Sequence, residues 1–291
     1  MAEITVDPAL CRKDGLCAMA CARGIFRQEE SGGTPEVVRA DTCFHCGHCV
    51  AICPSGAISH SDFPDGSVTS IKPEWTPSYD QVLQLIRNRR SKRLFKSTPV
   101  EREVIEQVIE AARFAPSGHN ARGTEYIVVQ DRDTLREVGK LTADGLRKMA
   151  KPFRSPVGRA AMRFVLGRRQ TEVFAGFAPE LEHLASVFDS GDDKLLNNAP
   201  VLVIFHADEV GGFASVDASL ALQNAALAAE ALGLGCFYVG FVVMACGRDD
   251  RIPKLLSLPE HHKVFGGLAM GYPRLSFGKW PERKPAKITW V

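Results

Sequence analysis

The sequence predicts an α+β protein made of two parts of unequal size. Seven of its nine cysteines lie within the first 53 of 291 residues, which marks a small cysteine-rich N-terminal domain at 1–60. Residues 61–78 are crowded with Pro, Gly, Ser and Asp and keep neither helical nor strand periodicity, as expected of a linker. Helical and strand patterns then alternate over 79–291. Two domains are what a chain of this length predicts.

The N-terminal domain carries a cysteine run formed by Cys43, Cys46, Cys49 and Cys53, followed by Pro54. Its spacing, C-x2-C-x2-C-x3-C-P, is typical of bacterial iron-sulfur proteins in which three thiolates hold one cluster and the fourth reaches another. Zinc sites also use paired C-x2-C units, but at longer separations. Disulfides are disfavoured, because the N-terminus lacks the basic region and apolar core of a signal peptide. Reduced thiols in turn predict a cytoplasmic location.

An altered copy of this run lies upstream, with Asp14 in the second ligand position after Cys11. Together the two runs resemble the two-cluster bacterial ferredoxin family, some members of which share the C-x2-D-x2-C pattern. Crossed ligation then predicts two ligand sets, Cys11, Asp14, Cys17 and Cys53 around cluster I and Cys21, Cys43, Cys46 and Cys49 around cluster II. A carboxylate is a harder ligand than a thiolate, so cluster I is expected as 4Fe-4S or 3Fe-4S and cluster II as 4Fe-4S. The alternative is that Asp14 is an exposed turn residue beside Gly15.

Short strands are expected on both sides of each cysteine run, at 4–7 and 24–26 and again at 36–38 and 57–59. This makes two β-turn-helix-β repeats. About 60 residues form a marginal core by themselves, so the clusters are expected to supply much of it.

The second part begins with helices expected at 79–89 and 101–115, the second with an apolar face. A strand at 125–130, a helix at 133–150, a strand at 201–206, a helix at 214–232 and strands at 236–243 and 263–270 follow. The most apolar stretch, 213–246, is interrupted by polar residues, so it predicts a buried helix and strand and no membrane span. The near-balanced charge argues against a nucleic-acid partner.

Four motifs in the second part occur in a diagnostic order: the string Arg89-Arg90-Ser91-Lys92-Arg93, the loop APSGHN at 115–120, the turn Gly233-Leu-Gly235 and the late Gly271-Tyr272-Pro273. In order and spacing they resemble the FMN-dependent nitroreductase family across 80–291. The resemblance implies an α+β domain with a central mixed sheet flanked by helices. It also implies bound FMN and a homodimer whose two chains both contribute to the flavin site.

Planar arginine side chains suit the dianionic phosphate of FMN. The resemblance implies that Arg89, Ser91 and Arg93 hold the phosphate and ribityl chain, with Arg90 nearby and Arg283 returning from the C-terminal segment. It further implies flavin contacts from Pro116, Ser117 and Asn120, and backbone amides of Val239 and Gly240 near the flavin N5. Two alternatives stay open: the string is a solvated helix end, and Gly240 marks a strand bulge.

Two residues depart from the family pattern, Arg122 where glutamine is common and Gly123 where proline is. An extra cation there favours an anionic reduced flavin or an acidic substrate. His119 is a candidate proton donor or a structural loop residue. Residues 147–169 hold eight Arg or Lys and no acidic residue. This segment is expected as a cationic cover over the flavin, a membrane-surface helix or a solvated helical face.

The fusion indicates an oxidoreductase, because clusters accept single electrons and no hydride. We expect electrons to pass from a soluble ferredoxin through two clusters to FMN, and then to a nitroaromatic, quinone or enone-like acceptor. NAD(P)H is the alternative donor. An electron-transfer hub that relays electrons between protein partners without a small substrate is the alternative function.

Overall fold

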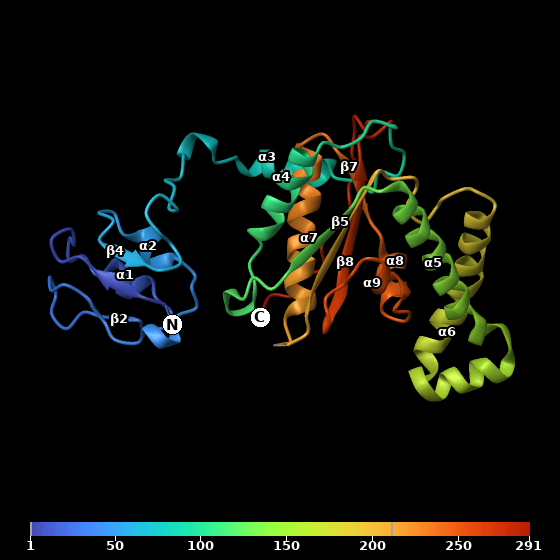
Figure 1. Ribbon diagram of the computed structural model, residues 1–291, viewed down its shortest axis with the longest axis horizontal. Helices are drawn as coiled ribbons and strands as arrows, with labels where there is room; N and C mark the ends of the chain where they lie inside the picture. The colour runs from blue at the N-terminus through green and yellow to red at the C-terminus, as the bar shows by residue number, and fades with distance from the viewer. Residues whose placement is uncertain (1, 211) are drawn as a thin grey trace. The chain divides into compact units, whose positions relative to one another are not determined.

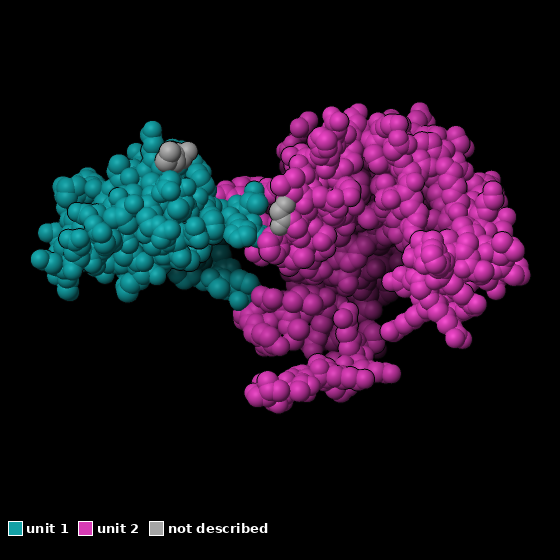
Figure 2. Space-filling model, turned by 90° about the horizontal axis from the view of Figure 1, so that it is seen from below, with its two compact units in different colours: residues 1–77, 118–121 teal, residues 78–117, 122–291 magenta. Residues whose placement is uncertain are grey.

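The computed structural model describes residues 2–210 and 212–291, which divide into two compact units (Figures 1 and 2). The first unit comprises Met1–Pro77 and Gly118–Ala121, and the second comprises Ser78–Ser117 and Arg122–Val291. Each unit has its own hydrophobic core.

The first unit contains the two predicted β-turn-helix-β repeats. Strand β1 (Ile4–Val6) pairs antiparallel with β4 (Ile58–His60), and β2 (Phe26–Arg27) pairs antiparallel with β3 (Glu36–Val37). The short helices are α1 (Leu16–Ala20) and α2 (His48–Ile52), with a 3-10 turn η1 at Ala40–Thr42. Each helix follows a glycine in the left-handed region, Gly15 at φ 70° and Gly47 at φ 74°, a conformation that glycine adopts without steric cost.

The core of this unit is small and consists of apolar strand residues together with cysteines. Its buried members are Ala2, Ile4, Cys17, Ile25, Phe26, Cys49 and Ile58. A side chain at Gly47 would lie 2.8 Å from the ring of Phe63, so the chain after the last strand folds back onto the second cysteine run. Beyond Phe63, the remainder of 61–77 contains the 3-10 turn η2 (Pro73–Trp75) and is exposed.

Helix α3 (Tyr79–Asn88) opens the second unit, and its start is set by a capping box. Ser78 Oγ accepts from the Gln81 N–H at 3.3 Å, while the Gln81 side chain accepts from the Ser78 N–H at 2.8 Å. These reciprocal bonds satisfy two backbone donors that a helix start leaves without partners. The predicted helix is thus confirmed.

A four-stranded sheet forms the centre of the second unit, in the order β5-β6-β8-β7. Its strands are β5 (Glu125–Val129), β6 (Val201–Asp208), β7 (Gly235–Tyr238) and β8 (His262–Gly271), and all three ladders are antiparallel. Within the described chain, parallel pairing occurs at one isolated bridge, between Ser91 and Cys236. A mixed sheet was expected, and the parallel component is limited to that bridge. The arginine string passes beside β7 there without forming a longer parallel ladder.

Helices cover both faces of this sheet, as Figure 1 shows. Val201, Val203 and Phe205 of β6 share one core with α4 (Arg102–Arg113) and α7 (Ala214–Ala231). Leu202 and Ile204 share the other core with α5 (Arg132–Ala150), α8 (Gly240–Cys246) and α9 (Arg251–Leu255). Because successive strand residues point to opposite faces, β6 is buried on both sides. The α+β prediction is confirmed.

One prediction about the elements was wrong. The strand expected at 236–243 ends at Tyr238 and turns into α8, because Val239 makes the last sheet bond and Val242 and Ala245 then turn into the core on helical spacing. The segment after α5 forms η4 (Lys151–Arg154) and α6 (Pro156–Asp189), which pack as a third core against the C-terminal half of α5. Gly167, at φ 76° and ψ 162°, interrupts α6.

Candidate functional site

The cysteines of the first unit are held in two similar arrangements. In each run, the sulfur of the first cysteine accepts a hydrogen bond from the backbone N–H two residues later. Lys13 donates to Cys11 and His45 donates to Cys43, both at 3.3 Å. The sulfur of the last cysteine in each run accepts a hydrogen bond from the backbone N–H four residues later. Ile25 donates to Cys21 at 3.4 Å, and Ala57 donates to Cys53 at 3.3 Å. Such N–H donors stabilise thiolate charge, as iron-sulfur ligation requires.

Electrostatic neighbours divide the sulfurs into two groups. Burial raises the pKa of Cys17, and repulsion from Cys11 and Cys53 adds to it. Burial raises the pKa of Cys49 to about 11, with repulsion from Cys46, Cys43 and Cys21 adding to it. These neighbours belong to the two sets that crossed ligation predicts. Thiolates this close ionise together only beside a cation, so the donor chemistry fits iron.

Asp14 is exposed, and its Oδ1 accepts a bond from the Leu16 N–H at 3.2 Å. This bond closes the turn that leads into α1, which is the arrangement expected of a turn aspartate. The role of Asp14 as an iron ligand stays a prediction.

His60 is a residue that the sequence did not single out, and it contacts a predicted cluster ligand. Its side chain is 4% exposed, and its Nε2 lies 3.5 Å from Cys43 Sγ. The Asp62 N–H donates to His60 Nδ1 at 3.1 Å, so the ring carries its proton on Nε2 and donates to the sulfur. His60 lies on β4 opposite Ile4, and its contact with Cys43 joins two segments 17 residues apart in the chain.

The loop at 118–121, which contains His119 and Asn120, belongs to the first unit. Asn120 Nδ2 donates to the carbonyls of Phe44 at 3.0 Å and His45 at 2.8 Å, and the His119 ring lies 5.3 Å from that of Phe44. The predicted Asn120–flavin contact and the proton-donor role of His119 stay predictions. In the second unit, Ser117, which follows the exposed Pro116, accepts from the Arg122 N–H through Oγ at 2.9 Å.

The arginine string of the second unit runs beside β7. Arg89 ends α3, Ser91 bridges Cys236, and the Lys92 N–H donates to the Cys236 carbonyl at 3.0 Å. A side chain at Gly235 would lie 2.9 Å from Lys92 Cβ, so glycine is what permits this approach. The guanidinium groups of Arg89 and Arg93 lie 5.7 and 5.3 Å from the rings of Tyr238 and Phe237.

The charges of the string are not equivalent. Lys92 Nζ donates to both carboxylate oxygens of Glu230 at 2.8 Å, and this partly buried ion pair neutralises the Lys92 charge. Arg90 donates to the Lys279 carbonyl through Nη2 at 3.1 Å, yet its Nε is buried and has no hydrogen-bond partner in the described chain. A buried donor without an acceptor costs about 1–3 kcal/mol. An oxygen-rich anion such as the FMN phosphate fits this position.

The end of β7 distinguishes the two residues predicted near the flavin N5. The Val239 N–H donates to the Gly267 carbonyl at 3.0 Å and is therefore occupied. The first bond of α8 runs from the Val243 N–H to the Val239 carbonyl, so the Gly240 N–H has no acceptor within the helix. Apart from its chain neighbours and its own helix, no described residue lies within 4 Å of a Cβ added at Gly240, and this open space fits a bound group.

The C-terminal segment returns to the same region. Arg87 lies 5.2 Å from the Trp280 ring and 3.9 Å from Glu282, and Arg90 lies 5.2 Å from the Phe277 ring. Arg283 follows directly in this segment and is exposed. The segment thus reaches the string, while the phosphate contact of Arg283 stays a prediction.

Four of the eight cations in 147–169 have carboxylate partners. The pairs are Arg147 with Asp144 and Asp189, Lys148 with Asp249, Arg154 with Glu182, and Arg163 with Glu172. Internal pairing thus reduces the positive charge that this segment was expected to present. Phe164 and Val157, by contrast, are 94% and 81% exposed. In the described chain, no helix is both long and apolar enough to cross a membrane.

A cleft beside α5 holds none of the predicted flavin residues. It is lined by α5, by Phe95–Ser97 and by residues between 188 and 200, and its charged side chains have both signs. This mixture of charges favours neither anions nor cations. The candidate flavin site is therefore assigned to the arginine string and the region of Gly240, and not to this cleft.

Two family models match the chain, in the order of its two parts. A 4Fe-4S dicluster domain matches residues 5–57. The nitroreductase family matches residues 86–272, more than half of the chain.

Individual relatives agree with the second match. An FMN reductase (NAD(P)H) from Bacillus subtilis is 28% identical over 204 residues, covering 69% of this chain and 70% of the relative. A Cr(VI) reductase from Pseudomonas sp. is 27% identical over 192 residues, covering 66% of each.

Solved structures give the same result for the fold. A nitroreductase with bound FMN from Desulfitobacterium hafniense is 26% identical with a TM-score of 0.51, covering 72% of this chain and 97% of its own. A nitroreductase with bound FMN from Bacteroides fragilis, 24% identical, has a TM-score of 0.54 and covers 72% of this chain and 98% of its own.

Proposed function

Because this chain belongs to the nitroreductase family and carries a 4Fe-4S dicluster domain ahead of the matched residues, we propose that it is a cluster-fed flavin reductase. As an oxidoreductase, it takes electrons from a low-potential donor, a soluble ferredoxin in preference to NAD(P)H. When bound, the clusters carry single electrons and FMN collects two of them for an organic acceptor such as a nitroaromatic, quinone or enone.

One observation carries this proposal: two groups of closely spaced cysteines occur in the same chain as an arginine string with a buried donor that has no partner among the described residues. A flavin reductase that took hydride directly would need only the second feature. The attached thiol groups therefore support an input of single electrons.

The residues of the second unit have distinct tasks in this proposal. Arg89 and Arg93 bind the FMN phosphate as planar donors, and Arg90 Nε donates to a phosphate oxygen. The Gly240 N–H donates to the flavin N5, since Val239 is occupied by Gly267. Ser91, Pro116, Ser117, Asn120 and Arg283 are the further proposed FMN contacts.

In the first unit, Cys11, Asp14, Cys17 and Cys53 hold cluster I, and Cys21, Cys43, Cys46 and Cys49 hold cluster II. None of the described cysteines forms a disulfide. The thiols need a reducing compartment, and the cytoplasm is the one we propose. A homodimer is proposed as the assembled form.

The test is anaerobic reduction of the holoprotein by reduced ferredoxin or by NAD(P)H, with flavin and cluster absorbance followed separately. We expect ferredoxin to reduce the flavin at least about tenfold faster than NAD(P)H does. Cys46→Ser, which removes an exposed ligand of cluster II, is expected to abolish the ferredoxin-driven reaction.

Cys246→Ser is the matched control, because Cys246 lies in α8 outside both cysteine groups. It is expected to keep the wild-type rate. Rapid flavin reduction by NAD(P)H that Cys46→Ser leaves unchanged would overturn the cluster route. Flavin that is reduced through the clusters but reoxidised only by protein partners would favour the electron-transfer hub.

A further inference from the structure

Three side chains on adjacent strands converge at one end of the central sheet. They are Glu125 on β5, His206 on β6 and His262 on β8, and one possible ligand atom from each lies within 4.8 Å of the others. The Nδ1 atoms of the two histidines are 2.9 Å apart. This group lies apart from the arginine string and from the cysteine runs in sequence, and the reductase function does not use it.

The sheet register explains why the three residues share a face. Glu125 lies directly opposite His206, so both side chains point to the same side. A β-bulge between Phe205 and His206 shifts the β6–β8 register by one residue, so that His206 faces Val264. Without this shift, His262 would point to the opposite face.

The two histidines of this group lie close together, and one of them is buried. His206 is 2% exposed, and its ring lies 5.1 Å from that of His262. A neutral imidazole keeps a lone pair for a metal, and a carboxylate supplies charge.

We propose that Glu125, His206 and His262 form a site for a divalent transition metal, with zinc as the representative ion. Two imidazoles and one carboxylate are a ligand set that zinc accepts, with a fourth position left for water. Tetrahedral coordination with Zn–N bonds of about 2.0–2.1 Å places the two nitrogens about 3.3 Å apart. The observed 2.9 Å needs only a few tenths of an ångström of opening.

Metal binding also requires a change of tautomer. In the hydrogen-bonded pair, one ring donates its Nδ1 proton to the other, so only one Nδ1 lone pair is engaged as acceptor. On coordination through both Nδ1 atoms, the donor ring carries its proton on Nε2 instead. No net proton is released by that ring.

The test measures zinc on the holoprotein, after iron and flavin contents show that clusters and FMN are in place. Protein is equilibrated anaerobically with zinc chloride and a competing chelator, and zinc per chain is measured by mass spectrometry. Loss of an outer-shell partner alone weakens metal sites about 10–100-fold, so we expect His262→Ala to weaken zinc binding at least about 100-fold.

His261→Ala is the matched control, because His261 is the exposed neighbour of His262 and lies outside the group. It is expected to bind one zinc per chain, as the wild type does. Zinc X-ray absorption should show only nitrogen and oxygen ligands, since sulfur at about 2.3 Å would indicate cysteine. Equal zinc binding by wild type and His262→Ala, or a sulfur shell, would overturn the proposal whatever the reductase assay gives.

Discussion

At the scale of single residues, the His60 side chain contacts Cys43, a proposed ligand of cluster II. Its Nε2–H points at Cys43 Sγ. The Asp62 N–H donates to Nδ1, which keeps the ring proton on Nε2. A hydrogen bond to a ligand sulfur withdraws charge from it and so favours the reduced cluster, which is the more negative form.

We therefore expect His60→Phe to lower the reduction potential of cluster II while preserving the iron content. The measurement is a redox titration followed by electron paramagnetic resonance. His48→Gln, at an exposed position at the start of α2, serves as the control and should keep the wild-type potential. A potential that His60→Phe leaves unchanged would show that the contact does not adjust cluster II.

Asp14 supports a second prediction at this scale. If it is the second ligand of cluster I, mild oxidation should remove one iron from the wild type and leave a 3Fe-4S signal. Asp14→Cys should retain that iron, because thiolate binds it more firmly than carboxylate does. Asp65→Cys, in the exposed turn after the first unit's last strand, is the control. Identical spectra for Asp14→Cys and wild type would leave Asp14 as a turn residue.

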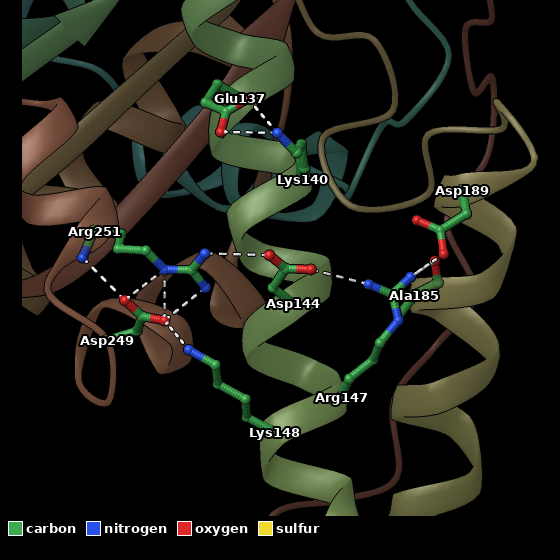
Figure 3. A network of polar contacts seen from close by, with 9 residues as sticks. All are labelled: Glu137, Lys140, Asp144, Arg147, Lys148, Ala185, Asp189, Asp249 and Arg251. Atoms are coloured by element: carbon green, nitrogen blue, oxygen red, sulfur yellow. Dashed lines mark hydrogen bonds and ion pairs between the residues drawn. The ribbon is translucent and has the colours of Figure 1, made fainter.

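At the scale of elements, a network of charges links α5 to its neighbours (Figure 3). Asp249, in the turn between α8 and α9, accepts from Arg251 Nη2 at 2.8 Å and from Lys148 Nζ at 2.7 Å. Arg251 also reaches Asp144 of α5 at 3.3 Å, and Arg147 connects Asp144 to the end of α6. Asp249 thus joins the short helices to the longer ones.

We expect Asp249→Asn to destabilise the second unit by on the order of 1 kcal/mol, or a few degrees of Tm. Hydrogen bonds from Arg251 and then Lys148 hold the Asp249 pKa well below its ordinary value. Its stabilisation is therefore complete above the unfolded-state pKa of about 3.9 and is lost as pH falls through the folded value.

Thermal unfolding checks this prediction. The Tm difference between wild type and Asp249→Asn should be equal at about pH 7 and pH 5.5 and should shrink below about pH 4. Asp250→Asn is the control, since the exposed Asp250 pairs only with Lys254 among the described ion pairs. A difference that grows on acidification would contradict the assignment.

At the scale of the whole molecule, exposed apolar residues on α7 favour a second copy of the chain as partner. Val216 and Leu220 lie one turn apart and are 54% and 40% exposed, although most of α7 is apolar. A helix that is apolar on all sides is usually buried.

Light scattering should therefore give a mass near twice 31.8 kDa for the wild type. A double change, Val216→Glu with Leu220→Glu, is expected to shift the mass toward one chain. Val157→Glu, at an 81% exposed position on α6, should leave the dimer intact. A monomeric wild type would contradict this prediction.

Much of this architecture was predictable from the sequence because its signals are local. Each cysteine run spans only one turn and one short helix, so its spacing can be recognised locally. The helices at 79–88, 102–113 and 132–150 follow from the periodicity of apolar residues and from capping. The arginine string was likewise visible, because its chemistry lies within five residues. Helix α8 was mistaken for strand, since an apolar run of this length does not distinguish the two.

The sequence by itself determined the cysteine spacing of the first unit and the cationic string of the second, because neighbouring residues define both. Only the tertiary structure placed Ser91 beside Cys236, left Arg90 Nε without a partner and brought Glu125, His206 and His262 together. These contacts join distant segments through sheet register, and a shift of one residue turns a side chain to the other face. No local pattern encodes such a shift, so the β-bulge at Phe205–His206 had to be seen in the folded chain.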